Sequence, residues 1–101
     1  MKLEDLSRNE VSLLLYLETR AVDYGGTVDP RHMNDLEFDI AETWWEAGFI
    51  EFGRLASSDV TPKRSHWVKL SDDAFKLAHE ARIARAERMW KNRHWKKTSE
   101  T

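Results

Sequence analysis

The spacing of apolar residues predicts a first helix near the N-terminus. The segment Ser7-Arg8-Asn9-Glu10 fits a capping box, in which the Ser7 hydroxyl accepts from the Glu10 amide and the Glu10 carboxylate accepts from the Ser7 amide. Leu6 and Val11 are spaced for a hydrophobic staple around this cap, and the LLLYL run that follows supplies a broad buried face. We expect the helix to end at Gly25-Gly26, because glycine takes the left-handed conformation that closes helices.

Two shorter patterns predict the next elements. Thr27-Val28 is typical of a short extended segment, and Asp29-Pro30 opens a short helix to about Asn34 with aspartate as its cap. A longer helix is expected within 35–47, ending at Gly48. At 100° per residue one broad arc of this helix is apolar, made of Leu36, Phe38, Ile40, Ala41, Trp44, Trp45 and Ala47. The outward wedge holds Asp39, Glu42, Thr43 and Glu46.

The second half of the chain predicts a hairpin and a long helix. Residues 49–55 and 66–70 are rich in aromatic and β-branched residues, and 61–64 form an exposed tip around Pro62. Ser71 caps a helix without an obvious breaker before Thr98. Its first half turns Ala74, Leu77, Ala78 and Ala81 inward, with Phe75 at the side. Its second half carries a separate stripe, Ile83, Ala86 and Trp90, which we expect to pack on the first helix or on a second subunit.

This order of elements resembles the winged helix-turn-helix superfamily. The stretch Trp44-Trp45-Glu46-Ala47-Gly48-Phe49-Ile50 is similar to the end of a recognition helix that leads into the first wing strand. The stretch Val68-Lys69-Leu70-Ser71-Asp72-Asp73-Ala74-Phe75 is similar to the second wing strand and final helix of multiple-drug-resistance-type regulators. The resemblance covers about residues 7–82. It implies a mainly α fold with a small β-hairpin, a winged helix-turn-helix with an extended C-terminal helix.

We therefore expect one winged-helix domain over 1–101, with its core at about 7–82 and a basic helical extension at 83–97. The resemblance also implies DNA binding, with the helix in 35–47 lying in the major groove and the hairpin tip touching the flanking backbone or minor groove.

Charge argues against that docking mode and moves the expected contact elsewhere. Residues 1–60 carry 5 Lys/Arg against 13 Asp/Glu, a net −8, whereas residues 61–101 carry 11 against 5, a net +6. Carboxylates on the recognition helix would oppose the counterion release that supplies most non-specific DNA affinity. A nucleic-acid contact is therefore expected at the wing and the last helix, on Lys63, Arg64, His66, Arg82, Arg85, Arg88, Lys91 and Arg93.

Other interpretations of the same residues stay open. A solvated helix face, stabilised by the negative C-terminal dipole, accounts equally well for the Arg/Lys run. Trp90, His94 and Trp95 alternate with these cations in the manner of base-stacking residues, although aromatics at helical spacing more often pack. The alternative function is a protein-protein interaction module, an adaptor or inhibitor of phage or mobile-element type. It would present Asp39, Glu42, Thr43 and Glu46 to a basic protein surface or imitate DNA charge. A homodimer through Ile83, Ala86 and Trp90 is expected in either case.

Several kinds of chemistry have no support in the residues. The chain has no cysteine, which excludes disulfides and thiolate chemistry. The segment His79-Glu80-Ala81-Arg82-Ile83 begins like a zinc-protease motif but has Ile83 where the second histidine is needed. We expect no enzyme activity, metal or cofactor. Without an apolar run of about 18 residues or a signal-peptide pattern, we also expect a cytoplasmic protein with no membrane contact.

Overall fold

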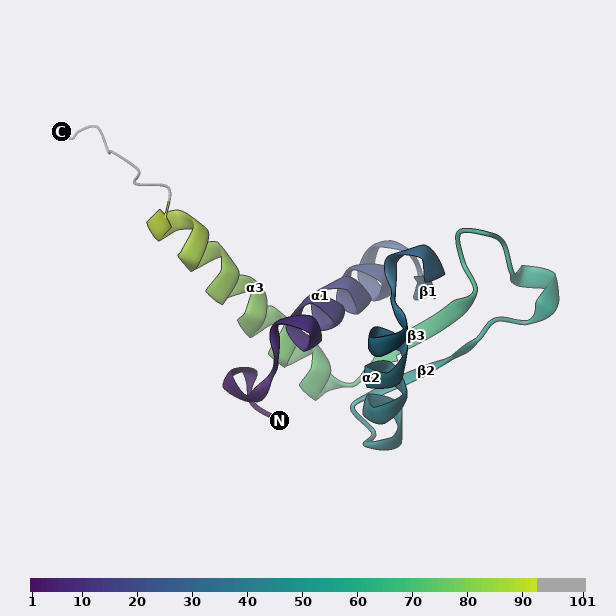
Figure 1. The fold of residues 1–101 in the computed structure, drawn as a ribbon, viewed down its shortest axis with the longest axis horizontal. Helices are drawn as coiled ribbons and strands as arrows, with labels where there is room; N and C mark the ends of the chain where they lie inside the picture. Colours follow the sequence, from purple (N-terminus) through teal and green to yellow (C-terminus); the bar gives the residue numbers. More distant parts are fainter. Residues whose placement is uncertain (93–101) are drawn as a thin grey trace.

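A computed structural model of the chain describes residues 1–92 and contains three α-helices and a three-stranded antiparallel sheet (Figure 1). The helices and strands are α1 (Arg8–Asp23), β1 (Thr27–Val28), α2 (Asp35–Glu46), β2 (Ile50–Arg54), β3 (His66–Leu70) and α3 (Asp72–Asn92). Three 3₁₀ helices stand between them, η1 (Leu3–Asp5), η2 (Pro30–His32) and η3 (Ser57–Asp59). The expected α-rich chain with a small hairpin is confirmed. The strand pair is extended by β1, which gives the sheet order β1-β3-β2.

Side-chain caps set where the helices begin. The predicted capping box is present at α1, where the Glu10 amide donates to Ser7 Oγ over 3.1 Å and the Ser7 amide donates to Glu10 Oε1 over 2.8 Å. A second capping box, between Asn34 and Glu37, opens α2. The short helix after Pro30 was expected to reach Asn34 but ends at His32. It is shorter because Asn34 is extended and caps the next helix.

The sheet depends on a close approach at Gly26. This residue has φ +85°, and a Cβ built on it would lie 2.9 Å from the Val68 carbonyl oxygen. The Val68 amide donates to the Gly26 carbonyl over 2.8 Å, which draws the end of α1 against β3. Only glycine satisfies both the backbone angle and the space. Gly26 therefore brings β1 into the sheet shortly after the end of α1.

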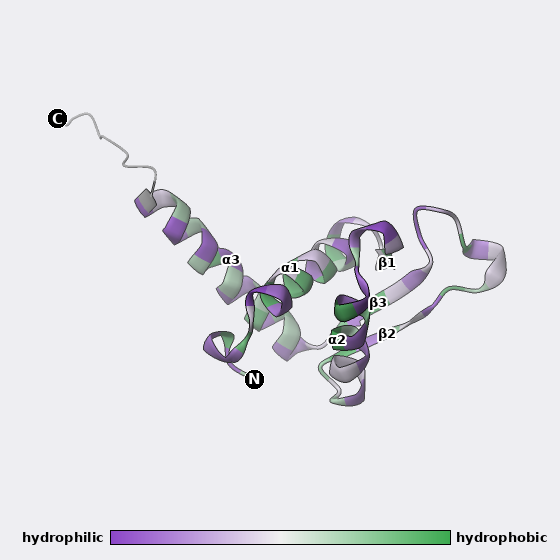
Figure 2. Ribbon diagram, in the orientation of Figure 1, coloured by the Kyte–Doolittle hydropathy of each residue, from purple (hydrophilic) through white to green (hydrophobic). Residues whose placement is uncertain are grey.

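The hydrophobic core lies where α1 meets the sheet, α2 and the first half of α3. Leu13, Leu14 and Leu17 are fully buried on α1. Ala74 and Ala78 are also fully buried, and these small side chains let α3 cross α1 closely. The inward face predicted for the first half of α3 is thus confirmed. In Figure 2, hydrophilic residues are prominent along the outer half of α3, away from this core.

The buried face of α2 is narrower than expected. Ala41 and Trp44 are buried, but Leu36 is 51% exposed, Trp45 is 48% exposed and Ala47 is exposed. The helix packs against β2 and α1 on one side only, so residues at the margins of the predicted apolar arc reach solvent. The wide arc expected from the sequence is wrong at these three positions.

The outer half of α3 leaves the core after Ala81. Ile83 is 48% exposed, Trp90 is 56% exposed, and Ala86 is exposed between them. At 100° per residue this stripe lies on the side of α3 opposite the buried alanines. The alternative that it packs on α1 is wrong for this reason. Its use between subunits stays a prediction.

Candidate interfaces of opposite charge

The outward side of α2 is an acidic face, made of Asp35, Asp39, Glu42 and Glu46. All four carboxylates are exposed, and α2 contains no lysine or arginine. Thr43, predicted as the one neutral contact, donates its hydroxyl to the Asp39 carbonyl over 3.0 Å. The structure therefore brings together the four residues of the predicted protein-contacting wedge. It leaves them without a cation on their own helix.

Trp45 gives this acidic face an apolar part. Its side chain is 48% exposed and lines a hollow of about 350 Å³ with Glu42 and Glu46. A half-exposed tryptophan beside carboxylates can bury apolar area against a partner while the charges select a basic one. The sequence placed Trp45 in the core arc and so did not indicate this feature.

A basic groove, which we call the arginine groove, follows the line where α3 crosses α1. It consists of two adjoining hollows, of about 380 and 310 Å³, that share Ser12 and Arg85. The first is also lined by Leu6, Arg8, Val11 and Arg88, and the second by Leu15, Tyr16, Thr19 and Arg82. Neither hollow is lined by an aspartate or glutamate. The arginine groove therefore combines an apolar base with guanidinium groups.

Arg82 ties the two sides of the arginine groove together. It forms an ion pair with Glu18 and donates to Thr19 Oγ1 over 2.6 Å and to the Leu15 carbonyl over 3.2 Å. These partners all lie on α1, so Arg82 fixes α3 on α1 and much of its charge is neutralised by Glu18. Within residues 1–92 no ion pair is formed by Arg8, Arg85 or Arg88. These three guanidinium groups carry the positive charge of the groove.

The hairpin tip is a second basic region, separate from the arginine groove. Lys63 and Arg64 are exposed there, and Arg64 Nε donates to the Asp59 carbonyl over 3.3 Å. Thr61 and Arg64 exchange backbone hydrogen bonds that close the tip. The tip and the outer half of α3 lie toward opposite ends of the molecule (Figure 1). The two basic segments expected to act together therefore do not form one continuous surface.

His66 is the first residue of β3 and pairs with Arg54 at the end of the strand ladder, so it lies outside the exposed tip at 61–64. Its ring stacks on Phe52 at 5.1 Å with planes 12° apart, and the Phe38 ring is 5.3 Å away. Burial, with a smaller effect from Arg54, lowers the pKa of His66 below its usual value. His66 therefore belongs to an aromatic cluster. It is not placed as an exposed cation beside Lys63 and Arg64.

Other predicted residues fall outside these groupings. Lys91 is exposed near the end of α3, beyond the groove lining, and Arg93 lies outside the described residues. Sequence reasoning missed Arg8 and Ser12, which enter the arginine groove from α1. No sequence signal marks them, because their neighbours Arg85 and Arg88 lie more than 70 positions away. Only the packing of α1 on α3 identifies the group.

Two remaining polar clusters have structural roles. Asp29 is buried and accepts from Arg31 Nε over 3.1 Å and from its Nη2 over 2.8 Å, and this side-chain bonding holds the pKa of Asp29 well below its usual value. Tyr16 Oη bridges the Asp29 amide and carbonyl at 3.0 Å each, which anchors the start of η2 to α1. Both clusters therefore fix the connection between α1 and α2.

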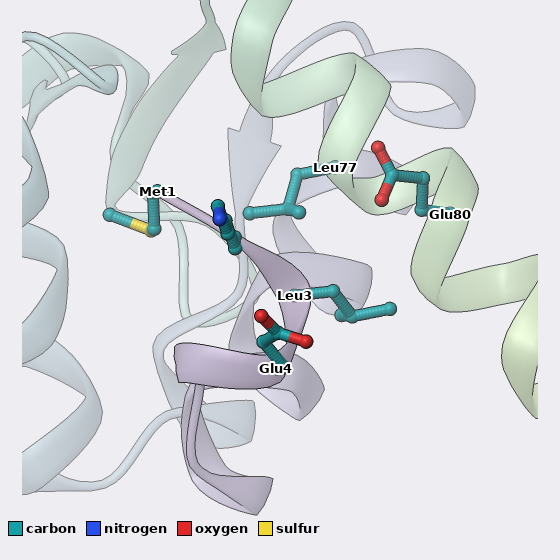
Figure 3. A pocket seen from close by; sticks show the side chains of 6 residues that line it. Met1, Leu3, Glu4, Leu77 and Glu80 are labelled. Carbon is teal, nitrogen blue, oxygen red and sulfur yellow. The ribbon is translucent and has the colours of Figure 1, made fainter.

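A hollow near the N-terminus is formed by the packing of η1 on α3 (Figure 3). Leu3 and Leu77 face it from the two elements, and Glu4 and Glu80 stand at its margin. These residues include no nucleophile with an adjacent base. The hollow is best explained as the edge of a helix contact.

Comparisons with known proteins leave the chain without an assigned relative. No protein-family model matches it, and neither a curated protein nor a solved structure does. Among the described residues, no helix has the length and apolar character needed to cross a membrane. The same part of the chain holds no cluster of three or more potential metal ligands. The charged surfaces are therefore the features of the described residues that bear on function.

Proposed function

We propose that this protein is a small, non-enzymatic winged-helix regulatory protein that binds nucleic acid. The winged-helix interpretation is supported by the element order: helix, short strand, short helix, helix, hairpin, helix. It is also supported by the sheet order β1-β3-β2, in which the short strand joins the hairpin. In this interpretation α2 stands in the position of the recognition helix and β2 and β3 form the wing.

The observation that carries the nucleic-acid proposal is the arginine groove. Arg85 and Arg88 are one helical turn apart, and Arg8 faces them from α1 across the same hollow. The guanidinium group matches phosphate oxygens in a two-bonded geometry and keeps its charge at any physiological pH. Because no carboxylate lines the groove, a phosphate backbone would meet little local repulsion. The groove therefore supports backbone binding with little sequence preference.

The acidic face argues against insertion of α2 into a major groove. Asp35, Asp39, Glu42 and Glu46 would each approach phosphate groups that already repel one another. The Thr43 hydroxyl, which donates to the Asp39 carbonyl, is not free to donate to a base. In this proposal α2 points away from the bound nucleic acid, and the hairpin tip makes at most a secondary contact.

A gel-shift or fluorescence-anisotropy titration on mixed-sequence duplex and single-stranded DNA, repeated across a salt series, tests the proposal. The double variant Arg85→Glu/Arg88→Glu should lose most affinity, and the slope of log affinity against log salt should fall by about two. Lys63→Glu/Arg64→Glu is the matched control, because it makes the same change in net charge at the other end of the molecule. It should lose much less affinity.

Two results would count against this assignment. Absence of salt-dependent DNA binding by the wild-type protein would remove the nucleic-acid function. Loss of affinity in the tip variant but not in the arginine-groove variant would move the contact to the hairpin.

A second candidate function, protein docking through the acidic face, is supported by Trp45. A half-exposed tryptophan that lines a hollow together with Glu42 and Glu46 has the character of an interface anchor. Glu42→Lys/Glu46→Lys should abolish capture of a partner from cell extract, while Glu80→Lys/Glu87→Lys, an equal charge change on α3, should retain it. Equal capture by both variants would exclude the acidic face as the docking site.

A further inference from the structure

The acidic face and the arginine groove are complementary in charge and in apolar content. The acidic face carries exposed carboxylates with Trp45 at its border, and the arginine groove carries guanidinium groups above the apolar side chains Leu6 and Val11. α2 packs against β2 and α1 with its acidic face outward, so it cannot enter the groove of its own chain. Contact between these surfaces therefore requires two copies.

We propose that the acidic face of one copy docks in the arginine groove of a second copy. Docking would cover the arginine side chains that would otherwise bind phosphate groups. Self-association and nucleic-acid binding then exclude each other. The second half of this inference rests on the proposed nucleic-acid function. The first half, docking between copies, stands without it.

The spacing of the charges fits such a contact. Glu42 and Glu46 are one turn apart on α2, and Arg85 and Arg88 are one turn apart on α3, so the two pairs can meet with similar separations. An arginine and a carboxylate form paired hydrogen bonds when their planes align. Trp45 lines one hollow together with the two glutamates at the border of the acidic face, where docking would bury it.

The energetics predict weak and salt-sensitive association. Exposed ion pairs each contribute little to binding, so charge alone does not hold the copies together. Burial of the half-exposed Trp45 side chain adds apolar contact area. Removing either the charges or Trp45 should therefore reduce association measurably without affecting the fold.

The symmetry of this contact differs from that of a two-fold dimer. The acidic face and the arginine groove are different surfaces, so the contact is head-to-tail and continues to further copies unless it closes into a ring. A dimer through Ile83, Ala86 and Trp90 would use the same surface on both copies and stop at two. The distribution of masses in solution separates these arrangements.

Sedimentation or light scattering over a concentration series at low salt tests the docking. The average molecular mass measured for the wild-type protein should increase with concentration and decrease when salt is added. Glu42→Lys/Glu46→Lys and Arg85→Glu/Arg88→Glu should each stay monomeric alone. An equimolar mixture of the two should associate again, because each reversed surface then meets an opposite charge. Glu80→Lys/Glu87→Lys, the control, should behave as the wild type.

A wild-type protein that stays monomeric overturns the docking, and so does failure of the mixture to associate. Association that the two double variants leave intact also overturns it, since the contact must then lie elsewhere.

Trp45→Ala tests the link to nucleic acid without changing net charge. It should weaken self-association and, at concentrations where the wild type associates, raise the apparent affinity for mixed-sequence DNA. Unchanged DNA affinity despite lost association would overturn mutual exclusion. Association without any DNA binding would remove the proposed function and leave the docking intact. DNA binding without association would overturn the docking and leave the proposed function intact.

Discussion

The acidic face and the arginine groove are both charged surfaces, and they are built in different ways. The acidic face comes from one helix, so the spacing of Asp39, Glu42 and Glu46 in the sequence already predicts it. The arginine groove joins Arg8 on α1 to Arg85 and Arg88 on α3. It exists only because the two helices cross. The difference shows that a face within one element is readable from local spacing, whereas a groove between elements depends on packing.

The largest expected effect comes from removing the core that supports both surfaces. Leu17→Ala should lower the free energy of unfolding by about 2–5 kcal/mol, because a fully buried leucine leaves a cavity when truncated. Chemical denaturation measures the loss. Val22→Ala on the same helix is the control, since Val22 is 63% exposed and its truncation should change stability by no more than about 0.5 kcal/mol. Similar losses in both variants would contradict the burial of Leu17.

A smaller change should affect the arginine groove and leave the acidic face intact. Arg82→Met removes the ion pair to Glu18 and the hydrogen bonds to Thr19 and the Leu15 carbonyl. We expect a loss of about 1 kcal/mol in the free energy of unfolding. The loss is small because this contact is partly exposed to solvent, which weakens the ion pair.

Thermal and chemical denaturation measure the effect of Arg82→Met. Lys76→Met is its control, because Lys76 is exposed on the same helix and no ion pair within residues 1–92 includes it. Equal stability of the two variants would show that Arg82 does not hold α3 on α1.

The smallest expected effect lies outside both surfaces, at His66. Burial lowers its pKa, so the folded state favours the neutral ring and the unfolded state binds more protons at mildly acidic pH. Stability is therefore full above the ordinary histidine value of 6.5 and falls as the pH drops below it. Denaturation at pH values on both sides of 6.5 measures this slope. His66→Phe should reduce this dependence of stability on pH. An unchanged slope in the variant would mean that another titrating group causes it.

Much of the local structure was predictable, and the failures share a cause. The Ser7 cap, the glycine stops, the hairpin and the inward face of early α3 all follow from neighbouring residues. The apolar arc predicted for α2 is too wide, because periodicity does not show how many elements pack on a helix. The sequence predicts His66 as a nucleic-acid contact of the wing, because it does not show that the Phe38 and Phe52 rings lie against the imidazole.

The sequence by itself determined the helices, the hairpin and the division of charge between the two halves, because caps, turns and charge counts depend on residues close together in the chain. Tertiary structure alone decided that Arg8 joins Arg85 and Arg88, that Trp45 reaches solvent, and that the hairpin tip stands apart from α3. These features depend on how α1, α2 and α3 cross. Helix crossings are set by contacts between residues far apart in the sequence, which local spacing does not encode.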